Sequence, residues 1–269
     1  MRRTLAAHGA AQPDVAPVSW QPLDCHAHTT MSDGALDVAE LVTAVRGRGV
    51  RPSVADHISR DVKGAIASVD GVREYLDTLD GFPVARGGEF CWHDSLWREI
   101  PPALAARFTH HIGSLHAVYL PGIELPLNMF SRRFPEGLDP DTYMEAHLAS
   151  FERFAREMPV DILAHPTLLP LSLRDHPLEK LWTEPREERA VEALYRGGIA
   201  FEVSSRYRPH VRFVRRAFER GVRLSLGSDG HQPDQVGDIS FSIALTRSIG
   251  VPDDQLYDPA VHGSRPWRV

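Results

Sequence analysis

The chain has 269 residues, of which 42% are hydrophobic and 25% charged, so it can bury a sizeable core as a globular protein. Its formal net charge of -6 offers no basic surface for extended nucleic acid or for an anionic membrane. The two cysteines, Cys25 and Cys91, show no CxxC spacing, which argues against a disulfide framework and a cysteine-based zinc finger. This usage favours a reducing, cytoplasmic location.

The N-terminal residues 1–20 are rich in alanine and lack the continuous apolar run of a signal peptide or a membrane span. We therefore predict a poorly ordered lead-in over residues 1–20, a single domain over residues 21–269 and no membrane partner. A small neutral or acidic substrate fits the charge of the chain better than a nucleic acid does. No pattern in the sequence indicates an oligomeric state.

Short apolar or β-branched runs alternate with helical patterns from Leu23 onward. The seven runs that predict strands are residues 23–28, 51–57, 82–90, 110–118, 160–166, 199–205 and 223–231. Amphipathic patterns that end near a glycine or proline predict helices over residues 35–50, 141–158, 186–198 and 209–222. This succession predicts an α/β fold with a mostly parallel sheet.

Two long segments rich in proline interrupt this alternation of strand and helix patterns: residues 119–140 and 167–185. We predict long loops there. Each is either a lid or substrate loop or a plain surface excursion, because long insertions after strands occur in both forms.

Nearly every predicted strand carries a histidine or a carboxylate at its carboxyl end. These residues are His26, His28, His57, Glu89, His116, His165, Asp229 and His231. In a βα barrel the carboxyl ends of the strands meet on one rim, so these side chains would converge. Imidazole and carboxylate groups suit Zn²⁺, Fe²⁺ or Mn²⁺. Because alternate residues of a strand face the same side, His26 and His28 can bind one ion together.

Each of these residues also has a structural explanation when it is taken alone. A histidine at a strand end is commonly a hydrogen-bonded structural residue, and Asp33 in the Ser-Asp-Gly turn commonly only shapes the turn. The combination favours a metal site, because nine independent buried polar groups would each need their own partner. By contrast, His110 and His111 start a strand, away from the predicted rim, and we expect them to be structural.

The ordered set of motifs resembles the polymerase-and-histidinol-phosphatase (PHP) family. The matching stretches are DCHAHTTMSDG (24–34), VADH (54–57), GGEF (87–90), IGSLH (112–116), LAHP (163–166) and GSDGH (227–231). GSLH and GSDGH look especially like the stand-alone phosphatases of the family. The resemblance implies a distorted (β/α)7 TIM-like barrel, which agrees with the seven strands predicted from the apolar runs.

The resemblance also implies three divalent metal ions, of Zn, Fe or Mn. In it, His26, His28, Glu89 and Asp229 hold the first ion; Glu89 bridges to a second, completed by His116 and His165; Asp33, His57 and His231 hold the third. The implied reaction is hydrolysis of a small phosphomonoester, similar to histidinol phosphate, by attack of a metal-bridging hydroxide. The catalytic residues would be Glu89, Asp229 and His231. Glu89 would chiefly position the metals, and His231 or a metal-bound water would protonate the leaving alkoxide.

Residues around the ligands are expected to support the site. Asp24 and Asp56 stand beside ligand positions, where they either orient an imidazole or cap a strand end. Arg206 is the first candidate for the substrate phosphate, because arginine suits bidentate phosphate recognition. Further candidates are Ser204, which stands where the family often carries an asparagine, then Arg60, and the weaker Arg132 and Arg133.

Two other functions share parts of this pattern. An amidohydrolase-like hydrolase also begins with a strand-end HxH, but the Ser-Asp-Gly turn, the GSDGH motif and the surplus of ligands count against it. A PHP-type module that serves a polymerase, or a nuclease acting on short oligonucleotides, is the other alternative. The chain contains no polymerase segment, and its acidic balance offers no track for DNA.

Overall fold

The computed structural model describes residues 20–120, 122–123 and 126–268; apart from Trp20, the predicted lead-in lies outside these residues. The strands are β1 (Ser53–Val54), β2 (His57–Ile58), β3 (Ala85–Arg86), β4 (Glu89–Cys91), β5 (Ile112–Ser114), β6 (Ala117–Val118), β7 (Leu127–Asn128), β8 (Ile162–Leu163), β9 (Ala200–Ser204) and β10 (Leu224–Gly227). The longer helices are α1 (Val38–Gly47), α2 (Val69–Leu79), α5 (Pro140–Glu157), α7 (Glu184–Gly197), α8 (Val211–Arg220) and α9 (Ser240–Ser248). Single turns are α3 (Leu96–Glu99), α4 (Pro102–Ala105), α6 (Leu178–Leu181), α10 (Pro259–His262), η1 (Leu171–Leu173) and η2 (Asp253–Gln255).

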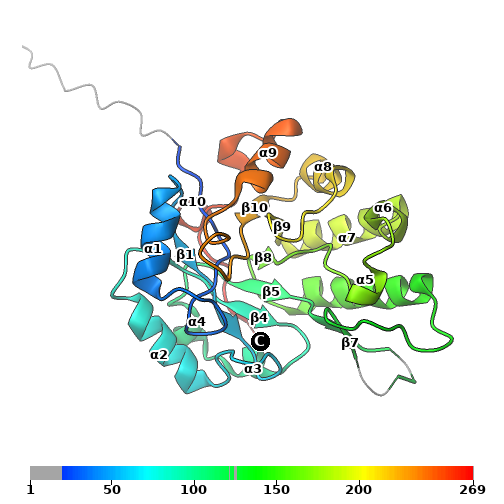
Figure 1. Cartoon of the computed structure of the whole chain (residues 1–269), viewed down its shortest axis with the longest axis horizontal. Helices are drawn as coiled ribbons and strands as arrows, with labels where there is room; N and C mark the ends of the chain where they lie inside the picture. Colours follow the sequence, from blue (N-terminus) through cyan, green and yellow to red (C-terminus); the bar gives the residue numbers. More distant parts are fainter. Residues whose placement is uncertain (1–19, 121, 124–125, 269) are drawn as a thin grey trace, which may run out of the picture.

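A six-stranded parallel sheet in the order β10-β9-β8-β5-β4-β2 forms the centre of the molecule, and β1 pairs with β3 in a separate parallel pair. Helices α1 and α2 lie to one side of the central strands, and α5, α7 and α8 lie to the other (Figure 1). The α/β fold with a mainly parallel sheet is thus confirmed. The assigned strands of the described residues form an open sheet rather than a closed barrel.

The first predicted strand, residues 23–28, is not assigned as a strand. It nevertheless makes isolated parallel bridges to both sides, from Leu23 to Arg51 and from Ala27 to Gly230. The N–H of Cys25 also donates to the carbonyl oxygen of Leu226, at 2.9 Å. This segment therefore lies between β10 and the chain around β1 and β2, which is the gap between the two edges of the sheet.

The predicted helices over residues 35–50, 141–158, 186–198 and 209–222 are confirmed as α1, α5, α7 and α8. Each has a capped or glycine-terminated end; for example, the side chain of Asp37 accepts a hydrogen bond from the N–H of Glu40 at the start of α1. The sequence patterns did not predict α2 and α9. In α2, the buried Tyr75 donates its hydroxyl to the carbonyl oxygen of Gly87, at 2.9 Å, and ties the helix to the strands.

The two predicted long loops contain short elements of their own. Residues 119–140 include β7, which pairs antiparallel with β6, so that Asn128 lies opposite Ala117. Residues 167–185 include η1 and α6. The β6–β7 pair follows His116 directly and carries the chain past the carboxyl end of β5, toward the predicted site.

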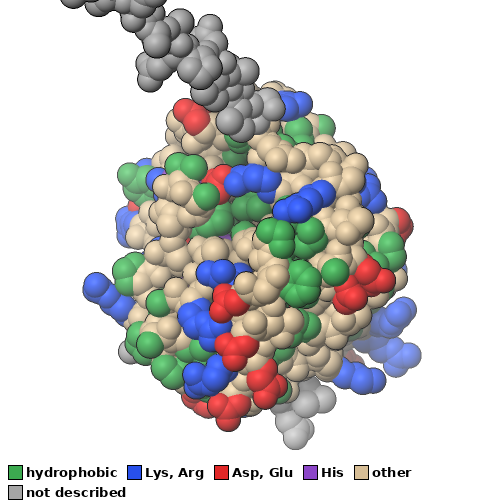
Figure 2. All heavy atoms as spheres, turned by 90° about the vertical axis from the view of Figure 1, so that its left-hand side faces the viewer, with side chains coloured by type: hydrophobic (Ala, Val, Ile, Leu, Met, Phe, Trp, Pro, Cys, Tyr) green, Lys and Arg blue, Asp and Glu red, His purple; other side chains and the backbone are tan. Residues whose placement is uncertain are grey.

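On the face of the molecule shown in Figure 2, basic and acidic side chains are interspersed among apolar ones. None of the helices in the described ranges is both long and apolar enough to cross a membrane. His110 and His111 are buried and hydrogen-bonded within the fold: His110 Nε2 lies 3.0 Å from the Cys25 carbonyl oxygen, and His111 Nδ1 lies 3.2 Å from Asp161 Oδ2.

Candidate metal centre

Glu89 lies at the centre of the cluster of predicted ligands and is fully buried. Its Oε1 atom is 3.2 Å from Nε2 of both His116 and His165. Its Oε2 atom is 2.6 Å from His57 Nδ1 and 3.3 Å from His26 Nε2. The parallel register places His57 and Glu89 side by side at the starts of β2 and β4. The two oxygens of Glu89 therefore face two different sets of imidazoles.

A second part of the cluster contains His26, His28 and Asp229, whose ligand atoms all lie within 4.8 Å of one another. The Nε2 atoms of the two histidines are 3.0 Å apart, and His28 Nε2 is 3.4 Å from Asp229 Oδ1. This agrees with the expectation that alternate residues of one extended segment face the same side.

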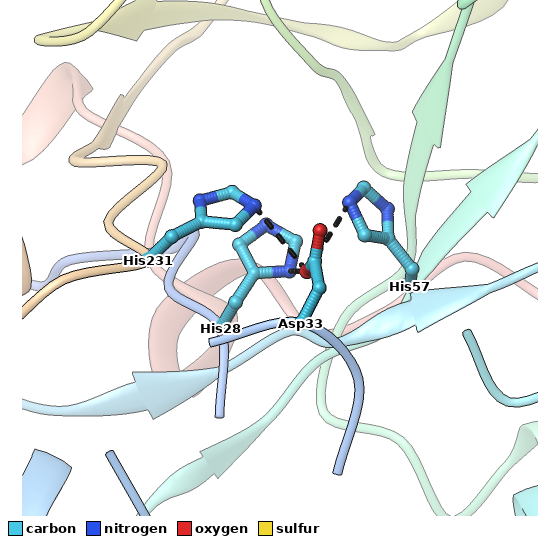
Figure 3. Close-up of side chains that lie close together, drawn as sticks. All are labelled: His28, Asp33, His57 and His231. Carbon is cyan, nitrogen blue, oxygen red and sulfur yellow. Dashed lines mark ion pairs between the residues drawn. The ribbon is translucent and has the colours of Figure 1, made fainter. Parts of the chain in front are cut away.

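Asp33 joins the cluster from the turn that follows the first segment (Figure 3). Its Oδ1 atom lies 3.4 Å from His231 Nε2, 3.7 Å from His57 Nε2 and 3.8 Å from His28 Nδ1. One ligand atom from each of these four residues falls within 4.8 Å of the others. The turn is compact, because a side chain on Gly34 would overlap the carbonyl group of His28.

Several polar atoms in the cluster are buried and have no hydrogen-bond partner among the described residues: His28 Nδ1, His57 Nδ1 and Glu89 Oε2. His57 Nδ1 and Glu89 Oε2 are close together, yet their geometry is not that of a hydrogen bond. A buried polar atom without a partner costs about 1–3 kcal/mol, and a divalent cation would satisfy such atoms. The donor set of imidazoles and carboxylates fits Zn²⁺, Fe²⁺ or Mn²⁺.

Two groups of the cluster, His28 and Glu89, are in the protonation state that a metal ligand needs. Burial and the neighbouring His57 imidazole lower the pKa of His28 to about 3, so this ring is neutral and keeps a lone pair for a metal. Burial favours the neutral form of Glu89, but the imidazoles of His57 and His116 outweigh it and hold its pKa well below the usual range. The carboxylate is therefore ionised, as a metal ligand must be.

The cluster forms the floor of a cavity of about 680 Å³, a size that suits a small ligand. Predicted ligands that line it are Asp33, His57, His116, His165, Asp229 and His231. The walls include Lys63, Phe130, Arg206 and Tyr207. A larger cavity, of about 1000 Å³, lies at the amino ends of the first strands, where Leu23 and Trp267 line it, and contains none of the predicted ligands.

Of the residues expected to contact substrate, the structure brings Arg206 to the cavity. Its Nη1 atom donates to the carbonyl oxygen of Asp229, at 3.0 Å. Ser204 and Arg60 lie outside this cavity. Ser204 is buried and its hydroxyl accepts from the N–H of Tyr207, and the Arg60 guanidinium makes two hydrogen bonds of 2.6 Å to Glu99 on the surface. Neither residue lines the cavity, and neither does the exposed pair Arg132 and Arg133.

The carboxylates of Asp24 and Asp56 accept hydrogen bonds from backbone N–H groups rather than from imidazoles. Asp24 accepts from the N–H groups of Ser228 and Gly237, at 2.8 and 3.0 Å, and so fixes the loop that carries Asp229. Asp56 accepts from the N–H of Thr29, at 2.7 Å, and fixes the turn that carries Asp33.

Two buried residues that the sequence patterns did not single out contact ligand imidazoles instead. Glu202 Oε1 is 2.7 Å from His26 Nδ1, and Cys91 Sγ is 3.1 Å from His116 Nδ1. The signal for Glu202 was a lone carboxylate in the otherwise apolar run of β9.

No protein-family model matches this chain, and no curated protein matches it. Among solved structures, it is similar to the histidinol phosphate phosphatase of Lactococcus lactis, solved with zinc, L-histidinol and phosphate: the TM-score is 0.66 and the identity 15%, over 86% of this chain and 95% of that one. A proposed metal-dependent phosphoesterase of Bifidobacterium adolescentis aligns over 88% of this chain and 97% of that one at 14% identity, with a TM-score of 0.33 that carries no weight. The likeness to the Lactococcus enzyme establishes a shared fold.

Proposed function

We propose that this protein is a metal-dependent phosphoesterase that hydrolyses a small phosphomonoester. The observation that carries this proposal is the convergence of eight nitrogen- and oxygen-donor side chains around that of Glu89, on the floor of a cavity walled by Arg206. Metal ligands in such a position serve phosphoryl chemistry well, because a phosphate needs several positive charges around it.

We also place the chain in the PHP family and interpret its fold as a distorted (β/α)7 barrel. The order of the six motifs supports the family, and so does the fold shared with a histidinol phosphate phosphatase. The barrel is supported by residues 23–28, which bridge to the chain on both sides of the gap in the sheet and would be its seventh element.

Three ions would be held in the arrangement that the family resemblance implies. The first would lie among His26, His28, Asp229 and Oε2 of Glu89; the second among Oε1 of Glu89, His116 and His165; the third among Asp33, His57 and His231. By distance alone, His57 rather than His165 joins Glu89 and His116 in a group whose ligand atoms all lie within 4.8 Å of one another. When bound, these ions would supply Lewis acidity that polarises the phosphate and lowers the pKa of a water molecule. The two-sided contacts of Glu89 support its role as the residue that positions two ions.

Arg206 would bind the phosphate oxygens. Its side chain is 37% exposed at the cavity wall, and its hydrogen bonds within the described residues use Nη1. Nε and Nη2 can therefore approach an anion in the fork geometry that suits phosphate. Lys63 adds a second positive charge to the same cavity.

The cavity and the charge of the protein limit the substrate. A volume of about 680 Å³ fits a small organic phosphate rather than a polymer. The net charge of -6 gives no support to an extended nucleic-acid partner. A monoester of a small alcohol is the substrate class that fits both properties.

The test is release of phosphate by metal-free protein that has been reconstituted with Zn²⁺, Mn²⁺ or Fe²⁺. We expect turnover of some members of a phosphomonoester panel and none of amides, lactones or short oligonucleotides. Glu89→Gln and His116→Gln should lower the rate by more than about 100-fold, as loss of a preorganised stabilising group does. His147→Gln, a buried histidine of α5 outside the cluster, is the matched control and should keep its activity.

Turnover of an amide or a lactone in place of every phosphomonoester would instead favour the amidohydrolase-like alternative. Phosphatase activity that survives Glu89→Gln and His116→Gln would contradict the proposed site.

A further inference from the structure

Glu202 is a fully buried carboxylate on β9, where its neighbours Phe201 and Val203 are also fully buried. Burial of a carboxylate costs several kcal/mol unless hydrogen bonds compensate it. The two oxygens of Glu202 therefore need strong donors, and both donors come from predicted metal ligands.

The first donor is the imidazole of His26. Its Nδ1 atom lies 2.7 Å from Glu202 Oε1, and a carboxylate only accepts, so Nδ1 carries the proton. When the ring is neutral, as a metal ligand must be, this proton on Nδ1 leaves the lone pair on Nε2, the atom that faces Glu89 and His28 at 3.3 and 3.0 Å. Glu202 thereby fixes both the tautomer and the direction of the ring.

The second donor is the backbone of His165. Its N–H donates to Glu202 Oε2, at 2.6 Å. His165 has a φ of 31°, a left-handed conformation that side-chain-bearing residues rarely adopt and that costs about 1–3 kcal/mol. The hydrogen bond holds this strained backbone, which in turn places His165 Nε2 3.2 Å from Glu89 Oε1.

Gly227, the last residue of β10, leaves room for this carboxylate. A Cβ atom there would overlap Glu202 Oε1 and would lie 3.1 Å from His26 Cβ. In the parallel register of β10 and β9, Gly227 pairs with Ser204, whose side chain lies on the same face of β9 as that of Glu202. Any larger residue at position 227 would therefore push Glu202 away from His26.

We propose that Glu202 and Gly227 form a positioning pair that presents His26 and His165 to divalent metal ions. This inference rests on the metal-dependent function proposed above. Glu202 acts through the two ligands, and its role concerns metal affinity. Glu202 belongs to none of the groups of side chains that could themselves hold an ion, and it does not line the cavity.

Zn²⁺ titration of metal-free Glu202→Gln, in competition with a chromophoric chelator, tests the pair. Glutamine keeps the shape of glutamate but places an NH₂ group against one of the two donors. We expect the ion at His26 to bind roughly 10- to 100-fold more weakly than in the unchanged protein. Glu187→Gln is the matched control, because Glu187 is another fully buried glutamate, bound to Arg212 and Arg216 between α7 and α8. It should lower thermal stability and leave the Zn²⁺ affinity unchanged.

Gly227→Ala tests the same pair without changing any charge. It should weaken Zn²⁺ binding in the same direction as Glu202→Gln. Gly113→Ala is its control: a Cβ atom at Gly113 would overlap Phe154 and Met158, so the change disturbs packing away from Glu202. This control should melt at a lower temperature while it keeps its Zn²⁺ affinity once folded.

A readout without metal separates positioning from a general structural role. In ¹H–¹⁵N NMR spectra of the metal-free protein, His26 should show a proton on Nδ1, and Glu202→Gln should lose or shift that signal. If the Glu202→Gln protein folds and binds Zn²⁺ with the same affinity and stoichiometry as the unchanged protein, the positioning role of Glu202 and Gly227 is wrong, while the proposed function still stands. If the unchanged protein bound no Zn²⁺, both the proposed function and this inference would fall.

Discussion

Arg206 and Arg60 carry the same guanidinium group, but the residues around them place these groups in different positions. Arg206 lines the cavity beside Asp229, whereas Arg60 is held by Glu99 on the surface. Both were predicted from the sequence as phosphate ligands. Position along the chain does not reveal that the Arg60 guanidinium donates hydrogen bonds to Glu99, 39 residues away.

The first prediction concerns this pair of arginines. Arg206→Ala should raise KM for the phosphomonoester substrate roughly 10- to 100-fold, because a hydrogen bond to a charged group contributes about 1.5–3 kcal/mol. Arg206→Lys should recover part of the loss, since lysine keeps the charge but not the fork geometry. Steady-state kinetics on the reconstituted enzyme measure both variants.

Arg60→Ala is the control and should leave KM unchanged. A rise in KM for Arg60→Ala that equals the rise for Arg206→Ala would contradict the assignment of the phosphate contact to Arg206.

At the scale of elements, the C-terminal segment is tied to the start of β8 by Asp161. This buried carboxylate accepts from the N–H groups of His111 and Arg265, each at 2.7 Å, and from the hydroxyl of Ser264 at 3.0 Å. Burial raises the pKa of Asp161, but the hydrogen bond and charge of His111 outweigh it, so that the pKa lies below its usual value. The ionised form is therefore the one that stabilises the fold.

The second prediction follows from the sign of this shift. A carboxyl group with a lowered pKa in the folded state stabilises the protein above its unfolded pKa, about 3.9, and loses that contribution as the pH falls toward the folded value. Asp161→Asn should therefore lower the free energy of unfolding at pH 7 by roughly 1–3 kcal/mol. Urea denaturation at pH 7 and at pH values below about 3.9 should show this difference shrinking at the lower pH. A difference that grows on acidification would refute the assignment.

The regular apolar spacing of α1, α5, α7 and α8 identified these helices. Helix α2 was missed, although its buried residues Val72, Tyr75, Leu76 and Leu79 also follow a helical spacing. Helix α9, which buries only Ser242 and Thr246, was also missed. Residues 23–28 were predicted as a strand, and their backbone hydrogen bonds do go alternately to neighbours on two sides, as in a central strand, but only isolated bridges form.

The candidate site was more predictable than its surroundings. Metal-ligand chemistry restricts which residue types can serve, and the parallel strands bring their carboxyl ends together, so the nine side chains that form the cluster could be named from the sequence. Glu202 could not, because its partner His26 lies 176 residues away and a lone strand carboxylate has no distinctive spacing. Asp24 and Asp56 were placed beside ligands, yet backbone N–H groups compete for them.

At the scale of the whole molecule, the cluster joins parts of the chain from His26 to His231. Without cations, three carboxylates and six imidazoles share one mostly buried site, and several of their atoms have no partner within the described residues. Ions that bind only the folded chain add to its stability through mass action. Metal binding of the kind proposed would therefore be coupled to folding.

The third prediction is that removal of metal lowers the melting temperature. Each ion contributes about 2.7 kcal/mol when its free concentration is 100 times its Kd. Thermal melts with a chelator, and then with Zn²⁺ restored, should show a loss and a recovery of stability. Glu89→Gln should show a smaller recovery, because it removes the carboxylate that faces both sets of imidazoles. Identical melting temperatures with and without Zn²⁺ would argue against a coupled site.

The most direct measurement is a crystal structure of the Zn²⁺-loaded protein with phosphate, with anomalous data collected at the zinc edge. We predict three anomalous peaks: one beside His26, His28 and Asp229, one beside Glu89, His116 and His165, and one beside Asp33, His57 and His231. The phosphate should lie over them, within hydrogen-bond distance of Arg206. Anomalous peaks that avoid Glu89, or a phosphate bound away from this cavity, would contradict the proposal of a metal-dependent phosphoesterase.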